Sequence, residues 1–280
     1  MRTYLFILIL FFGSHSAHSQ NLNANDNSSD HGIQRPKLVV GIVIDQMRWD
    51  YLYRFYNLYK ADGGFKRLLN QGFSCENTMI PYIPTFTACG HTSIYTGSVP
   101  AIDGITGNDW WDYDLGKYAY CTQDDNVKTV GSNTVEGKMS PRNLLVTTIG
   151  DELRLATNFQ SKVIGIALKD RAAILPAGNG ANAAYWYDDS TGNWITSSYY
   201  MNDLPGWLKD FNAKKSVDSY YQKNWNTLYP LSTYTQSTPD AEPYEYRPWG
   251  ANVTGFPYDL SQFTGKNYVA IHVVPYGNTS

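Results

Sequence analysis

Uninterrupted apolar runs are the clearest feature of the sequence. Residues 37–44 and 162–168 consist largely of Val, Ile and Leu without polar alternation. This pattern is typical of strands that are buried on both faces, as in a parallel sheet. Residues 73–79 predict a further strand. Because segments with helix signals lie between these runs, the pattern predicts an α/β fold.

Four of the intervening segments carry helix signals. They are residues 49–59, 64–70, 140–158 and 204–214. The first two are separated by the sequence Asp-Gly-Gly, and the third begins with Ser140 followed by proline, a favourable pair for a helix start.

A fifth helix, over residues 88–95, follows a proline-containing segment and is expected to stop at Gly97. Thr87 should therefore lie at its N-terminus. Unpaired backbone N–H groups and the positive end of the helix dipole favour a bound anion at such a place. A threonine there can equally serve as an ordinary N-cap residue.

The character of the chain changes from about Gly178. Residues 183–187 and 193–196 predict a hairpin, and residues 219–258 are rich in Tyr, Trp and Pro with little periodicity. We interpret residues 36–180 as the N-terminal part of an α/β core, residues 181–267 as an inserted aromatic-rich cap, and residues 268–280 as an incomplete return to the core.

The first 19 residues have the layout of a secretory signal peptide. Arg2 precedes a short apolar run, and small residues stand at Ala17 and Ser19. The run is too short for a membrane span, which argues against the alternative of a membrane anchor. We expect cleavage near Ser19–Gln20, a disordered lead-in over residues 20–35, and a periplasmic or secreted protein. N-terminal sequencing of exported protein checks this.

Composition narrows the choice of function. A net charge of -3 excludes a basic nucleic-acid binder. No later segment is apolar for long enough to span a bilayer. The three cysteines, Cys75, Cys89 and Cys121, show neither CxxC nor zinc-finger spacing and are interpreted as structural.

Polar residues follow the predicted strands at positions where α/β sheets bind ligands. Asp45 follows the first strand, and Lys169 and Arg171 follow residues 162–168. Asn108 lies in a turn-rich loop over residues 97–111. Each has an ordinary alternative, because the aspartate could cap a helix, the asparagine could form a turn, and the basic pair could be solvated.

Taken together, these motifs resemble a known superfamily. A strand followed by aspartate precedes Pro-Thr-x-Thr-x-x-Gly-His at residues 84–91, Gly-Ile-x-Gly-Asn at residues 104–108 and Lys-Asp-Arg-Ala-Ala at residues 169–173. In this order the pattern resembles the alkaline phosphatase superfamily, in its type I phosphodiesterase/nucleotide pyrophosphatase branch. The resemblance implies a sheet with helices on both faces. Within the branch it resembles the periplasmic alkaline phosphatases that use a threonine nucleophile.

The resemblance implies a role for each residue. Thr87 resembles the nucleophile, which would form a phosphothreonine and also bind zinc, and Asp45 resembles a ligand of the same zinc ion. Asn108 resembles the amide that holds a phosphoryl oxygen. Lys169 and Arg171 resemble the pair that marks enzymes acting on small phosphate monoesters, because they bind oxygens that a diester has esterified. His91 is interpreted as a structural hydrogen-bonding residue.

The family's two-zinc site takes several further histidine and aspartate ligands. Beyond the predicted signal peptide this sequence has only His31, His91 and His272. His31 is in the lead-in, and His272 is interpreted as a core residue within a predicted strand over residues 268–274. The chain therefore resembles the N-terminal half of a longer enzyme. By itself it is expected to bind zinc weakly and to show no phosphatase activity above background.

Two alternatives remain open at the level of sequence. The first is a phosphodiesterase or nucleotide pyrophosphatase, against which Lys169 and Arg171 argue. The second is a non-catalytic exported binding protein, if the gene ends at Ser280. The natural substrate and the oligomeric state are not predicted.

Overall fold

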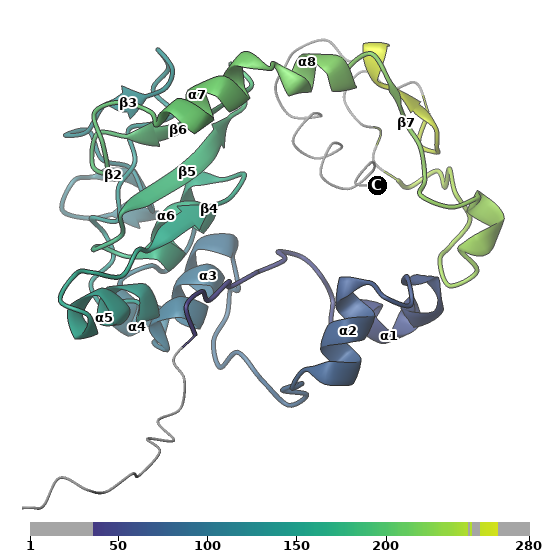
Figure 1. The fold of residues 1–280 in the computed structure, drawn as a ribbon, viewed down its shortest axis with the longest axis horizontal. Helices are drawn as coiled ribbons and strands as arrows, with labels where there is room; N and C mark the ends of the chain where they lie inside the picture. The colour runs from purple at the N-terminus through teal and green to yellow at the C-terminus, as the bar shows by residue number, and fades with distance from the viewer. Residues whose placement is uncertain (1–35, 246, 248–252, 263–280) are drawn as a thin grey trace, which may run out of the picture. The chain divides into compact units, whose positions relative to one another are not determined.

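The computed structural model describes residues 36–245, 247 and 253–262, and the chain divides into two units at Ile42/Val43. All elements described below belong to the second unit, and Figure 1 labels most of them. The predicted signal peptide, the lead-in with His31, and the predicted return to the core with His272 lie outside the described residues.

The largest sheet has the strand order β3-β6-β5-β4. These strands are Thr129–Val130, Asn193–Ser197, Ala183–Asp188 and Ile164–Ile166, respectively. β4 and β5 are parallel, whereas β5 and β6 form the predicted antiparallel hairpin. Every residue of β5 is buried. The sheet is therefore mixed, with β5 and β6 as its two inner strands.

Helices cover both faces of this sheet, which confirms the predicted fold class. α6 (Asp170–Ala177) connects β4 to β5 and packs on both strands, and α7 (Gly206–Ala213) packs against β6. Side chains of β5 alternate between the two faces, as the strand period requires. One face is formed by Val130, Ala183, Tyr185, Leu204 and Leu208, and the other by Ala173, Ile174, Ala184, Trp186 and Ile195.

The predicted helix at Thr87 is confirmed as α3 (Thr87–Thr96). Thr87 is its first residue, after the extended Phe86, and the helix ends at Gly97, whose φ of 67° suits a residue without a Cβ. α3 packs against α6. A core cluster consisting of Ala88, Ile105, Cys121, Leu144 and Leu175 joins the start of α3 to α6.

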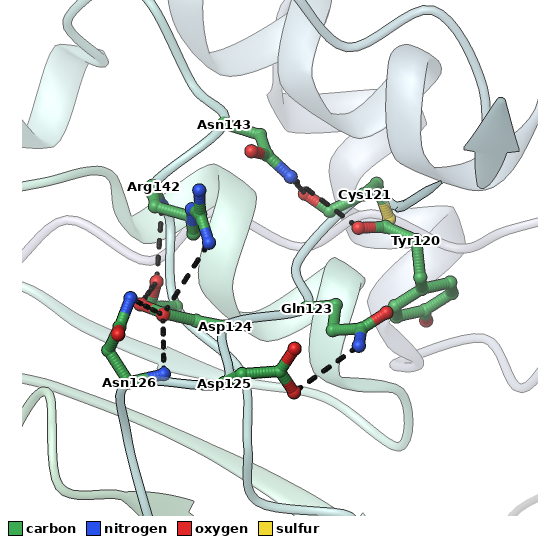
Figure 2. Close-up of polar contacts among 9 residues, drawn as sticks. Tyr120, Cys121, Gln123, Asp124, Asp125, Asn126, Arg142 and Asn143 are labelled. Atoms are coloured by element: carbon green, nitrogen blue, oxygen red, sulfur yellow. Dashed lines mark hydrogen bonds and ion pairs between the residues drawn. The ribbon is translucent and has the colours of Figure 1, made fainter. Parts of the chain in front are cut away.

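The segment that was predicted as an irregular loop contains regular structure. α4 (Pro100–Asp103) lies within it, and β1 (Asp109–Asp112) begins immediately after Asn108. β1 pairs with β2 (Lys117–Tyr120) in an antiparallel hairpin. The loop after β2 is closed by Asp124, which accepts hydrogen bonds from Asn126 and lies 3.8 Å from an Arg142 nitrogen (Figure 2).

Two predicted strands do not form. Residues 37–44 and 73–79 have no strand structure, and Leu38, Val39, Val40 and Ile42 are 67–78% exposed. A β-branched run becomes a strand only where a neighbour supplies hydrogen bonds, and within the described residues neither run has one. Residues 162–168 do form a strand, but β4 is the terminal strand of the described sheet, and Ile164 and Ile166 are more than half exposed.

The predicted helix over residues 140–158 is shorter than expected. α5 spans Ile149–Ala156, and Thr148 and Asp151 form a capping box at its start. The Ser140 hydroxyl donates instead to Asp124 at 2.7 Å. A reciprocal cap at Thr148 satisfies the first N–H groups of α5 and therefore places the helix start there, beyond the Ser-Pro pair.

The other predicted helices are confirmed in part. Residues 49–59 form only α1 (Tyr51–Arg54) and the 3-10 turn η1 (Tyr56–Leu58), whereas α2 (Gly64–Gln71) and α7 agree closely with expectation. The remaining elements are α8 (Ser216–Tyr220), β7 (Asn224–Trp225), η2 (Leu231–Thr233), β8 (Tyr258–Asp259) and η3 (Leu260–Gln262). The division into core and cap at residue 181 stays a prediction, although β5 and β6 share a sheet with β4.

Two further observations complete the fold. Cys75 is exposed, Cys89 and Cys121 are buried, and all three are free thiols. Among the described residues no helix combines the length and apolar character that a bilayer span requires.

Gly165 in β4 allows α6 to approach the sheet closely. A Cβ at this position would overlap the Ala173 carbonyl oxygen and lie 3.0 Å from the Ala177 Cβ atom. Gly165→Ala is expected to lower the free energy of unfolding by about 1–3 kcal/mol, as overpacking does. Urea unfolding measures this. Gly64→Ala is the matched control, because a Cβ added at Gly64 would meet no atom within 4 Å, and its effect should stay within about 1 kcal/mol.

Candidate active site

The site is built around the hydroxyl of Thr87. Its Oγ1 donates a hydrogen bond of 2.8 Å to Asp45 Oδ2. Because Thr87 is the first residue of α3, this hydroxyl lies where backbone N–H groups have no partner within the helix. Asp45 lies in a turn and not at the end of a strand. The next residue, Gln46, has a positive φ, and its N–H donates to Asp45 Oδ1 at 3.0 Å.

The Asn108 side chain is hydrogen-bonded to the first turn of the same helix, α3. Its Oδ1 accepts a hydrogen bond of 3.0 Å from the backbone N–H of Ala88. An N–H group can only donate, so this contact assigns the carbonyl oxygen of the amide to the helix side and leaves Nδ2 as a donor for another group. Asn108 is therefore more than a turn residue.

Lys169 and Arg171 lie where β4 leads into α6. Lys169 precedes the helix as its N-cap residue and lies 3.7 Å from Asp189 Oδ2. Arg171 is half-buried, and its Nη1 donates to the Tyr120 hydroxyl at 2.8 Å. The pair is therefore not simply solvated. Arg171 Nε is buried and has no hydrogen-bond partner within the described part of the chain.

His91 connects these groups electrostatically. Burial lowers the pKa of His91, the Asp45 carboxylate opposes this shift and the Arg171 guanidinium adds to it. The ring is therefore neutral at pH 7, and Nδ1 donates to the Thr87 carbonyl oxygen at 2.9 Å. This contact agrees with the predicted structural role of His91.

Sequence reasoning missed two residues, Tyr120 and Asp170. The Tyr120 hydroxyl donates to Asp170 Oδ1 at 2.9 Å, and Asp170 Oδ2 accepts from the Thr122 hydroxyl. In the sequence, the only feature that could have indicated a role for Asp170 is its position between Lys169 and Arg171. Nothing in the sequence connects Tyr120 to a helix 50 residues later.

The donor set fits part of a zinc site. Asp45 Oδ2 and Thr87 Oγ1 are two oxygen atoms close enough to bind one ion. Zinc takes about four ligands, and within the described ranges no group of three or more His, Cys, Asp or Glu residues could hold a metal. Asp45 and Thr87 thus supply two ligands at most.

The fold and the site define an α/β protein in which a threonine hydroxyl at a helix start is hydrogen-bonded to an aspartate, and an asparagine side chain is hydrogen-bonded to the next backbone N–H of that helix. The chain belongs to the type I phosphodiesterase / nucleotide pyrophosphatase family, whose model matches residues 39–246.

Three relatives show how the family resembles this chain. Alkaline phosphatase PhoV of Synechococcus elongatus is 57% identical over 273 residues, which are 98% of this chain and 50% of PhoV. A protein named calcium-transporting ATPase from Myroides odoratus is 60% identical over 248 residues, covering 88% of this chain and 45% of that protein. Alkaline phosphatase PafA of Elizabethkingia meningoseptica is 53% identical over 252 residues, covering 89% and 46%. The chain spans about half the length of these curated relatives.

A solved structure of a PafA variant superposes on this fold with a TM-score of 0.83 at 51% identity, covering 87% of this chain and 47% of that chain. The variant replaces a threonine by serine, and an asparagine, a lysine and an arginine by alanine. The same four residue types follow one another here as Thr87, Asn108, Lys169 and Arg171. In both proteins one residue separates the lysine from the arginine.

Proposed function

We propose that the protein is an alkaline phosphatase that hydrolyses small phosphate monoesters through a phosphothreonine at Thr87. The observation that carries this proposal is the position of the Thr87 hydroxyl, at the first residue of α3 and 2.8 Å from Asp45 Oδ2. The similarity to PhoV and PafA, two proteins that are named alkaline phosphatases, also supports it.

The reaction proceeds in two displacements. Thr87 Oγ1 attacks phosphorus as its proton passes to water, the bond from phosphorus to the leaving alkoxide breaks, and the alkoxide takes up a proton from water. Water then attacks the phosphothreonine and releases inorganic phosphate and the threonine hydroxyl. Each displacement is in line and spreads negative charge over the non-bridging phosphoryl oxygens, so positioning and charge stabilisation supply most of the rate.

Three side chains would hold those oxygens. Asn108 donates through Nδ2, which its contact with Ala88 leaves available. Lys169 and Arg171 supply two positive charges at the end of β4. In a diester one more oxygen is esterified, so it has one fewer charged oxygen for this pair to bind. This difference favours monoesters as substrates.

We further propose that Asp45 and Thr87 help to bind one of two zinc ions. Bound zinc lowers the pKa of a coordinated hydroxyl and offsets negative charge on the leaving oxygen. Asp45 also accepts the hydrogen bond that orients the Thr87 hydroxyl. We propose export to the periplasm or the medium, on the strength of the signal-peptide pattern in residues 1–19.

A phosphodiesterase is the second candidate, because the matching family model carries that description. The deciding experiment compares kcat/KM of the full-length protein for p-nitrophenyl phosphate and bis(p-nitrophenyl) phosphate. A clear preference for the monoester, lost on chelation and restored by zinc, is expected. A preference for the diester would establish the second candidate instead.

A further inference from the structure

Arg171 belongs to a buried hydrogen-bonded chain that the proposed reaction does not itself require. Arg171 Nη1 donates to the Tyr120 hydroxyl at 2.8 Å, and that hydroxyl donates to Asp170 Oδ1 at 2.9 Å. Asp170 Oδ2 accepts from Thr122. A single hydroxyl therefore stands between two adjacent residues of opposite charge.

The direction of each hydrogen bond follows from the chemistry of the groups. A guanidinium only donates and a carboxylate only accepts, so the tyrosine must accept from Arg171 and give its one proton to Asp170. Burial raises the pKa of Tyr120, and the charge of Asp170 adds to this effect. The hydroxyl therefore keeps its proton at neutral pH. Burial also raises the pKa of Asp170, and the hydrogen bonds from Thr122 and Tyr120 and the charge of Arg171 oppose that shift and favour the carboxylate that accepts from Tyr120.

The position of Tyr120 is fixed by its strand. Tyr120 pairs with Asp109 across the β1–β2 hairpin, and the N–H of Cys121 donates to the Asn108 carbonyl oxygen at 2.9 Å. Asn143 Nδ2 donates to the Cys121 carbonyl oxygen at 3.0 Å (Figure 2). The Tyr120 ring packs on the core cluster that joins α3 to α6. One hairpin thus carries both Asn108 and the partner of Arg171.

We propose that Tyr120 is a positioning residue, which holds the Arg171 guanidinium towards the phosphoryl group and prevents it from pairing directly with Asp170. The inference rests on the proposed phosphatase function and on Arg171 binding substrate in it. Without the hydroxyl, Arg171 Nη1 and Asp170 Oδ1 both lose a partner in a region of low dielectric, where opposite charges attract strongly. Arg171 would then turn towards Asp170 and away from the substrate.

The test is Tyr120→Phe in the full-length protein. Loss of a hydrogen bond to a charged group corresponds to roughly a 10- to 100-fold effect, so kcat/KM for p-nitrophenyl phosphate should fall by about that factor. Activity on bis(p-nitrophenyl) phosphate should change by less than about 3-fold, because Arg171 contributes less to it. Tyr118→Phe is the matched control, since Tyr118 lies on the same strand and is 68% exposed, and both activities should be unchanged.

Two double variants separate positioning from general damage. In an Arg171→Ala background, Tyr120→Phe should have no further effect on the monoester. In the Tyr120→Phe background, Asp170→Asn removes the charge that draws Arg171 away and should restore part of the preference for the monoester. Thermal unfolding checks that each variant is folded.

Each outcome decides one of the two claims. An equal loss on both substrates by folded Tyr120→Phe, an effect additive with Arg171→Ala, or no recovery with Asp170→Asn would overturn the positioning role. Absence of monoester hydrolysis in the unmodified protein would instead overturn the proposed function.

Discussion

Replacement of both Lys169 and Arg171 by alanine is expected to lower kcat/KM for a phosphate monoester by roughly 10³-fold or more. Loss of one preorganised donor to a developing charge costs about 10²–10³-fold in comparable sites, and two cationic groups are removed here. Both side chains are partly buried. Charge interactions with a phosphoryl group are stronger in such an environment than in water. Paired assays on a monoester and a diester measure the effect.

The diester should lose much less activity, because it has one fewer charged oxygen to bind. Arg142→Ala/Lys162→Ala is the matched control. This control also removes one arginine and one lysine charge. The Arg142 side chain is 52% exposed, and Lys162 is exposed and lies before the start of β4. The control should retain nearly full activity on both substrates. Equal losses on the two substrates by the Lys169/Arg171 variant would contradict the assignment as a monoesterase.

Thr87→Ala is expected to reduce monoester hydrolysis by roughly 10⁴-fold or more, as removal of a catalytic nucleophile does elsewhere. No other hydroxyl is hydrogen-bonded to Asp45 among the described residues. Thr87→Ser keeps the hydroxyl at the start of α3 and should retain substantial activity. Steady-state assays of the full-length variants provide the measurement.

Thr85→Ala is the control for this experiment. Thr85 is exposed and lies two residues before Thr87 in the same segment, and its replacement should leave kcat unchanged. Substantial turnover by Thr87→Ala, free of contaminating wild-type protein, would show that another group attacks phosphorus.

Local signals in the sequence predicted the helices best. The stop at Gly97 depends on one residue and its positive φ, and the start of α3 follows from the segment before it. The hairpin of β5 and β6 was recognisable because its turn residues are local as well. The start of α5 was placed wrongly because the sequence analysis took Ser140 as the cap and overlooked the local capping box of Thr148 and Asp151, and in the structure the Ser140 hydroxyl donates to Asp124.

Strands were predicted less well because they depend on partners that are distant in sequence. Residues 37–44 have the composition of a buried strand but no neighbouring strand among the described residues. β4 acquires its pairing only through β5, after a connection that includes α6. Apolar composition therefore indicated which segments could form strands, but not which of them pair.

The candidate site shows the same division. Motif order was sufficient to select Asp45, Thr87 and Asn108, and the structure brings the first two within 2.8 Å and attaches the third to α3. Tyr120 could not be selected, because its role depends on side-chain contacts with residues 50 and 51 positions later. A tyrosine in an aromatic-rich chain carries no local mark of such a contact.

The central claim is that the phosphoryl group is first transferred to Thr87 and only then to water. The most direct measurement is the stereochemical course at phosphorus. A phosphorothioate monoester made chiral by oxygen isotopes is hydrolysed by the full-length protein in isotopically labelled water. Two in-line displacements each invert the configuration, so the account predicts net retention in the thiophosphate released. Net inversion would mean that water attacks the substrate directly, and it would contradict a phosphothreonine intermediate.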